Sequence, residues 1–234
     1  MAWDGPCLIW HENLLDMKTE FIVKGFIDDN ISALDDFPGY PPILGSISEY
    51  KPSEDDVFVC SIGGRTRSKC IQSILDRGGE FIPLIHKTAR IGSNVVMGKG
   101  NQVGAFTTIA ADAKIGDYNF IQSNTIIGHD VTIGSWNRID SHVMCVGGTV
   151  IGDYNMIHTS AMINHNVKIG NNTLVGACSF VITDVEDNTT VAGNPARESN
   201  MKVLEKVFNY RCRTWNRQVY SSAFYGRWSH CLYK

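Results

Sequence analysis

The chain has 234 residues, enough for one large or two modest domains, and its 21 Lys and Arg residues nearly balance 24 Asp and Glu residues. This balance excludes a strong global attraction to nucleic acid or anionic membranes, and it favours a small molecule or a protein as partner. Seven scattered cysteines without a Cys-x-x-Cys pair, no basic-then-apolar start and no run of roughly 18 apolar residues predict a soluble cytoplasmic protein without an integral membrane segment.

Residues 1–86 are predicted to form a small parallel α/β domain, because strand-like segments alternate with one amphipathic segment. A strand is expected over residues 21–30, a loop over 37–42, a second strand over 56–64 and a helix over 66–77, followed by an extended segment over 81–86.

Two groups of residues in this domain are candidates for binding a nucleotide. Asp28 and Asp29 end the first strand, where carboxylates can bind a ribose or a base. Ser61, Ile62 and Gly63 belong to a glycine turn whose backbone can approach a phosphate closely. The alternative for the two acids is that they are simply solvated.

An uninterrupted six-residue repeat occupies residues 87–196. From Ile91 to Val181 every sixth residue is apolar, sixteen in all, and glycine follows nine of them. Such a period predicts short strands joined by tight turns, in which we expect glycine to supply positive φ. Three hexads make one 18-residue triangular coil, so the sequence predicts a parallel β-solenoid with sixteen interior rungs.

The repeat contains one histidine beside one aspartate, in the sequence "IGHDVTIG". His129 is expected at an outward corner of the solenoid, where a neutral imidazole can act as a general base. Asp130 is expected to orient that imidazole. The alternative is a solvated turn histidine.

The register places Gly147 directly over His129, one coil later, because the two are 18 residues apart. A position without a side chain there can admit a thioester and offer a backbone N–H to an oxyanion. The alternative is that Gly147 and Gly148 only turn a corner.

Other histidines raise the question of a metal site. His165 lies in the same column two coils away, about 9–10 Å from His129, which is too far to share a zinc ion within one chain. His142 and His158 are expected to be surface or interface residues. We therefore predict no metal site.

Residues 197–234 are predicted to form a C-terminal helix, over about 201–210, followed by a basic aromatic tail. Contact of this tail with a membrane surface or nucleic acid is the alternative to a packed helix and a solvated tail.

The segments "GFIDDN", "SIGG", "IGHDVTIG" and "VAGNPAR", together with the repeat, resemble the hexapeptide-repeat acyltransferases of the sialic-acid O-acetyltransferase and bacillosamine-type sugar N-acetyltransferase branch. The resemblance implies an all-β left-handed parallel β-helix, a homotrimer, and acetyl-CoA bound between two subunits. It also implies a Rossmann-like N-terminal domain that holds a nucleotide-linked sugar.

The same resemblance implies further cofactor contacts. Gly176, Ala177 and Ile182 would line the pantetheine groove, and Asn194 and Pro195 would lie near the adenine end. Family members open with a strand and a Gly-x-Gly-Gly turn, whereas this chain opens "MAWDGPCLIWHENLL". We therefore expect a Rossmann-like domain that lacks its first strand.

The function implied is transfer of an acetyl group from acetyl-CoA to an amino or hydroxyl group of a nucleotide-activated sugar, in the synthesis of surface polysaccharides or glycan precursors. Two alternatives are a non-catalytic trimeric β-helix that binds or assembles other molecules, and a zinc enzyme like the γ-class carbonic anhydrases. The zinc alternative is disfavoured because the position of that family's third histidine is Gly170 here.

Overall fold

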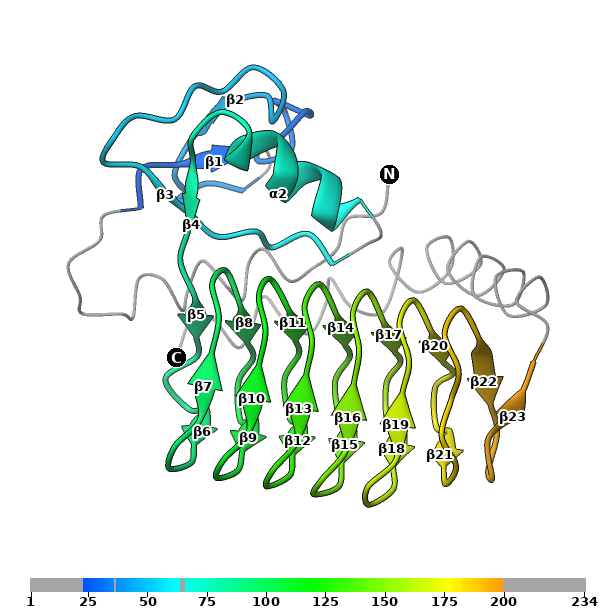
Figure 1. The fold of residues 1–234 in the computed structure, drawn as a ribbon. Helices are drawn as coiled ribbons and strands as arrows, with labels where there is room; N and C mark the ends of the chain where they lie inside the picture. The colour runs from blue at the N-terminus through cyan, green and yellow to red at the C-terminus, as the bar shows by residue number, and fades with distance from the viewer. Residues whose placement is uncertain (1–22, 36, 64–65, 200–234) are drawn as a thin grey trace.

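A computed structural model describes residues 23–35, 37–63 and 66–199. Most of these residues form a β-solenoid, and a smaller N-terminal part with one helix lies over one of its ends (Figure 1). The solenoid strands are, in chain order, β5 (Leu84–Ile85), β6 (Arg90–Ile91), β7 (Val96–Met97), β8 (Gln102–Val103), β9 (Thr108–Ile109), β10 (Lys114–Ile115), β11 (Phe120–Ile121), β12 (Ile126–Ile127), β13 (Thr132–Ile133), β14 (Arg138–Ile139), β15 (Met144–Cys145), β16 (Val150–Ile151), β17 (Met156–Ile157), β18 (Met162–Ile163), β19 (Lys168–Ile169), β20 (Leu174–Val175), β21 (Phe180–Val181), β22 (Thr190–Ala192) and β23 (Arg197–Glu198).

These strands form three sheets, which are the three faces of a prism. The eight-stranded face contains β5, β8, β11, β14, β17, β20, β22 and β23; the six-stranded face contains β6, β9, β12, β15, β18 and β21; the five-stranded face contains β7, β10, β13, β16 and β19. Strands pair in parallel with partners 18 residues away, for example Ile127 with Cys145 and Ile133 with Ile151. The predicted solenoid with an 18-residue coil is therefore confirmed.

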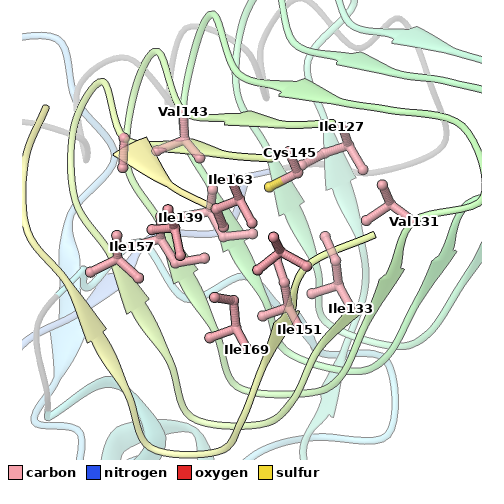
Figure 2. Close-up of a cluster of buried hydrophobic side chains, with 14 of the residues drawn as sticks. Ile127, Val131, Ile133, Ile139, Val143, Cys145, Ile151, Ile157, Ile163 and Ile169 are labelled. Atoms are coloured by element: carbon pink, nitrogen blue, oxygen red, sulfur yellow. The ribbon is translucent and has the colours of Figure 1, made fainter. Parts of the chain in front are cut away.

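The interior is a continuous aliphatic column (Figure 2). The fourteen rungs from Val103 to Val181 are all buried. Each contributes on the order of 1.5–3 kcal/mol before chain entropy is subtracted. The prediction of sixteen interior rungs is wrong for the first two, because Ile91 is 42% exposed and Met97 is half-buried. Both lie in the first full coil, at the end of the stack, where packing comes from one side.

The repeat glycines have a different role from the one expected. Positive φ falls on the third residue after each rung, usually a non-glycine residue such as Asp130 (φ 57°). Gly128 is needed instead because the coils approach closely: a Cβ there would stand 2.6 Å from the backbone nitrogen of Gly147. Close backbone approach, rather than backbone conformation, therefore selects glycine directly after a rung.

A buried asparagine ladder joins successive coils along the eight-stranded face. The backbone N–H of Asn119, Asn137 and Asn155 each donates to the side-chain Oδ1 of the asparagine 18 residues earlier, at 2.8–2.9 Å. These bonds satisfy buried polar groups in the interior of the stack.

The N-terminal part is not one sheet. Among the described residues, β1 (Phe26–Ile27) pairs with β2 (Ile43–Gly45), β3 (Val57–Phe58) pairs separately with β4 (Glu80–Phe81), and α2 spans Arg67–Leu75. The helix confirms the prediction for 66–77, the strands are shorter than expected, and β2 was not predicted.

The expected Rossmann-like sheet is thus not found in the part of the chain that the structure describes. Its small apolar cluster around Ile71, Ile74 and Phe81 extends onto Tyr118 and Trp136 of the solenoid. These segments pack on the solenoid instead of building a separate sheet with its own core. Residues 1–22 and the helix and tail predicted after residue 199 lie outside the described residues. No helix within the described ranges has the length and apolar character needed to cross a membrane.

Candidate active site

His129 and Asp130 lie at the corner between the six-stranded and five-stranded faces, in the turn from β12 to β13. His129 Nδ1 and Asp130 Oδ2 are 2.7 Å apart, and both side chains are about two-thirds exposed, at 65% and 66%. The left-handed conformation of Asp130 belongs to the turn rather than to a strand. The carboxylate therefore holds one ring nitrogen and leaves Nε2 as the group that can exchange a proton.

Gly147 lies against the other edge of this imidazole. A Cβ on Gly147 would stand 2.6 Å from His129 Nε2, so a side chain at this position would displace the ring. The neighbouring Gly148 N–H donates to the carbonyl of His129 at 2.9 Å. The N–H of Gly147 has no acceptor within the described ranges. The structure thus brings together the predicted base, its carboxylate and a backbone donor.

An apolar ladder runs along the six-stranded face beside this corner. Its outward residues Ile126, Met144, Met162 and Phe180 pair in register from coil to coil. Ile126 is 42% and Met162 39% exposed. Apolar side chains in a row on a sheet surface are typical of contact with another molecule.

His165 lies two coils from His129, in the same column, as the pairing of Ile127, Cys145 and Ile163 requires. Within the residues that the structure describes, no group of three His, Cys, Asp or Glu side chains is arranged to hold a metal ion.

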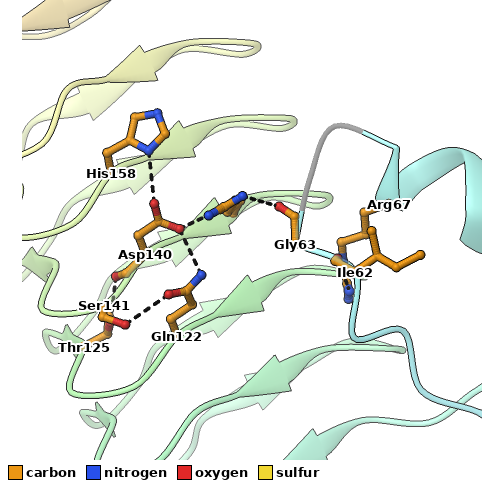
Figure 3. Close-up of polar contacts among 9 residues, drawn as sticks. Ile62, Gly63, Arg67, Gln122, Thr125, Asp140, Ser141 and His158 are labelled. Atoms are coloured by element: carbon orange, nitrogen blue, oxygen red, sulfur yellow. Dashed lines mark hydrogen bonds and ion pairs between the residues drawn. The ribbon is translucent and has the colours of Figure 1, made fainter. Parts of the chain in front are cut away.

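His158 contradicts its prediction as a surface residue. It is buried, with 7% of its surface exposed, and its Nδ1 lies 3.0 Å from Asp140 Oδ2. Gln122 Nε2 also donates to Asp140, at 3.1 Å (Figure 3). Gln122, Asp140 and His158 are spaced by 18 residues, so they form a polar column that turns the imidazole inward. His142 is exposed, as expected.

The Asp140 carboxylate is also an anchor for Arg138, whose Nε donates to it at 2.6 Å. Burial raises the pKa of Asp140, but the hydrogen bonds and charges of His158 and Arg138 outweigh burial and bring that pKa below its ordinary value. Sequence reasoning missed this group. The signal was the 18-residue column, which had been followed only from His129.

The predicted phosphate-binding turn at Ser61, Ile62 and Gly63 meets this group. Arg138 Nη1 donates to the carbonyl of Gly63 at 2.5 Å, and Arg67 Nη1 donates to the carbonyls of Ile62 and Cys60. Two guanidinium groups therefore hold three carbonyls of the turn, and the turn is fixed against the eight-stranded face.

A cavity of about 300 Å³ lies between this turn, the start of α2 and the eight-stranded face. Its lining consists of Gly63, Arg67, Ser68, Trp136, Asn137, Arg138, Tyr154, Asn155, Met156, Asn172, Thr173 and Leu174. Of the predicted substrate-binding residues, only Gly63 lines it.

The other predicted contacts lie elsewhere. Asp28 Oδ1 accepts a hydrogen bond from Asn30 N–H at 2.8 Å, and Asp29 Oδ1 accepts one from Ile47 N–H at 3.0 Å, so both acids stabilise loops. The remaining candidates are on the last coils: Gly176 is buried, Ala177 and Ile182 are exposed, and Asn194 and Pro195 lie exposed between β22 and β23.

Comparison with known proteins agrees with this fold. The family model described as bacterial transferase hexapeptide (six repeats) matches residues 112–147 and 148–183. A curated relative, "Uncharacterized protein L142" of Acanthamoeba polyphaga mimivirus, is 36% identical over 100 residues, which are 42% of this chain and 20% of that protein. The chain thus spans about a fifth of the length of the curated relative that it matches.

Several solved structures are similar over most of the chain. WeeI from Acinetobacter baumannii AYE superposes with a TM-score of 0.75 at 25% identity, covering 85% of this chain and 97% of its own. PerB from Caulobacter crescentus, solved with CoA and GDP-perosamine, has a TM-score of 0.68 at 26% identity, covering 75% and 84%. The acetyltransferase domain of PglB from Neisseria gonorrhoeae FA1090 shares the fold, with a TM-score of 0.75 at 23% identity over 85% and 97%. By repeat and by fold, the chain belongs with the hexapeptide-repeat β-helix acyltransferases, structurally near PglB, WeeI and PerB.

Proposed function

We propose that the protein transfers an acetyl group from acetyl-CoA to an amino group of a nucleotide-linked sugar, in the cytoplasmic synthesis of surface polysaccharides or glycan precursors. The observation that carries the proposal is the His129–Asp130 pair with Nε2 of the imidazole against Gly147. The PerB structure, which contains CoA and GDP-perosamine, supports both the donor and the class of acceptor.

The proposed reaction follows from these three residues. The acceptor amine attacks the thioester carbon, and His129 Nε2 takes the amine proton while Asp130 stabilises the imidazolium. The Gly147 N–H donates to the oxygen of the tetrahedral intermediate. A carbon–nitrogen bond forms, the carbon–sulfur bond breaks, and the imidazolium returns its proton to the departing CoA thiolate.

The proposal includes a homotrimer. The His129 corner is open to solvent, and it borders the apolar ladder Ile126, Met144, Met162 and Phe180. The cavity lies on the eight-stranded face, which does not include that corner. A second copy packed on the ladder would cover the corner and exclude water from it.

Acetyl-CoA is proposed to lie in the groove between two subunits. Its pantetheine arm would run past Gly176, Ala177 and Ile182, and its adenine would lie near Asn194 and Pro195. Ala177, Ile182, Asn194 and Pro195 are exposed and free to contact such a ligand.

A mass-spectrometric acetylation screen against nucleotide-linked 3-amino and 4-amino sugars tests the function. We expect one acceptor to gain a single acetyl group in the presence of acetyl-CoA. A chain that acetylates no acceptor and releases no heat on titration with acetyl-CoA would instead be a non-catalytic binding or assembly protein.

A further inference from the structure

The cavity on the eight-stranded face is positively charged. Its lining includes Arg67 and Arg138 and no acidic side chain. Asp140, which does not line the cavity, is shared between Arg138 and His158. One carboxylate therefore faces two guanidinium groups and an imidazole, and the cavity lacks the negative charge that would balance it.

Arg67 has the largest imbalance. It is buried, with 7% of its surface exposed, and its Nε and Nη2 atoms have no hydrogen-bond partner among the described residues. No carboxylate within those residues pairs with it, and burial lowers its pKa. An unpaired buried guanidinium costs several kcal/mol unless a bound anion or water satisfies it.

Two further donors lie around the same cavity. The side-chain Nδ2 of Asn155 is buried and has no acceptor among the described residues. Helix α2 begins at Arg67, with Ser68 in its first turn and no acidic residue there, so its positive end is not neutralised by its own side chains. These groups favour an anion and add to the unpaired Arg67.

An aromatic column forms another wall of the cavity. Tyr118, Trp136 and Tyr154 are spaced by 18 residues and stack with ring centroids 4.4 Å and 6.1 Å apart, the second pair being parallel to within 3°. The next member of the column is Asn172, which also lines the cavity. Tyr154 is 54% exposed, so the column ends in a ring with surface left to contact a ligand.

We propose that this cavity binds the anionic part of the acceptor, with Arg138 and Arg67 binding a phosphate or carboxylate group while Tyr154 and Trp136 pack against an adjoining ring. The cavity as an anion site stands on the contacts above, and only its assignment to the acceptor rests on the proposed function. The fixed position of Arg138, between Asp140 and Gly63, presents its guanidinium without a conformational search.

Calorimetric titration of the full chain, without acetyl-CoA, tests the site. The probes are a nucleoside diphosphate, inorganic pyrophosphate, glucuronate and an uncharged nucleoside. We expect an anion to bind and the nucleoside alone to bind at least tenfold more weakly. Binding of pyrophosphate identifies a phosphate as the anion, whereas binding of glucuronate alone identifies a carboxylate.

Arg138→Gln should weaken anion binding at least tenfold, and Arg138→Lys should recover part of the loss. Tyr154→Leu should weaken the nucleoside diphosphate more than pyrophosphate. Arg90→Gln, in the first full coil away from the cavity, is the matched control and should bind as the unmodified chain does. Circular dichroism identifies any variant that fails to fold, and Tyr154→Leu keeps the test valid if Arg138→Gln does so.

The proposal is overturned if no anion binds, or if folded Arg138→Gln and Tyr154→Leu bind as the unmodified chain does. Binding is also measured in His129→Ala, which should leave it unchanged. Anion binding that depends on Arg138, in a chain that acetylates nothing, would refute the proposed function and keep the site. Acetylation with unchanged anion binding in Arg138→Gln would do the reverse.

Discussion

The Nε2 edge of the His129 imidazole rests against Gly147 of the next coil, at a distance that leaves no room for a Cβ. The other ring nitrogen is bound to Asp130. The imidazole is therefore positioned by a carboxylate on one side and by a bare backbone on the other, and these two contacts give it a defined direction.

The substitution Gly147→Ala should separate activity from stability. Its Cβ meets only the end of an exposed side chain, which can rotate away, so we expect the melting temperature to fall by no more than a few degrees. The rotation breaks the contact with Asp130, and acetylation should fall at least tenfold.

Gly128→Ala is the matched comparison, because its Cβ meets backbone atoms at 2.6 and 2.8 Å, which cannot move aside. It should lower the free energy of unfolding by roughly 1–3 kcal/mol. Thermal unfolding and an acetylation assay on both variants check the pair, and equal destabilisation by the two substitutions would contradict it.

The asparagine ladder predicts a large loss of stability from Asn119→Ala. The side chain is fully buried, accepts bonds from Asn137 and donates to the carbonyl of Gly134 at 2.9 Å. Removing it leaves buried groups unpaired and should cost roughly 2–4 kcal/mol, measured by urea denaturation. Lys114→Ala, on an exposed side chain of the five-stranded face, should change stability by less than about 0.5 kcal/mol.

The Asp140 carboxylate predicts a pH-dependent contribution to stability. Because its folded pKa lies below the ordinary value of about 3.9, its stabilisation is fully present above roughly pH 5 and is lost as pH falls through the folded pKa. Asp140→Asn removes this term and should lower the free energy of unfolding at pH 7 by roughly 1–3 kcal/mol. Denaturation at several pH values should show a gap between the two proteins that narrows below pH 4; a constant gap would refute the assignment.

The apolar ladder predicts the contact between subunits. Met144→Glu places a carboxylate in the middle of Ile126, Met144, Met162 and Phe180, and we expect the trimer to dissociate. Light scattering during gel filtration measures the mass. Thr132→Glu, an exposed position on the five-stranded face, is the control. Retention of a trimer by Met144→Glu would show that the subunits meet elsewhere.

The repeat was predictable because one physical requirement, an apolar side chain every sixth residue, acts on all coils alike. The same register placed Gly147 over His129 before any coordinates. It did not reveal His158, because the inward turn of that imidazole depends on Asp140 and Gln122, whose column was not followed. The N-terminal part could not be predicted either, since two-residue strands such as β1 and β3 carry too little pattern and pack partly on Tyr118 and Trp136.

Acetylation by His129→Ala, measured on the acceptor that the screen identifies, tests the central claim most directly. Removal of the base should lower kcat by roughly 10²–10⁴-fold, with little change in stability because the side chain is exposed. Asp130→Asn, which keeps a residue that tolerates positive φ, should cause a smaller loss. A folded His129→Ala protein that acetylates at the rate of the unmodified chain would contradict the mechanism.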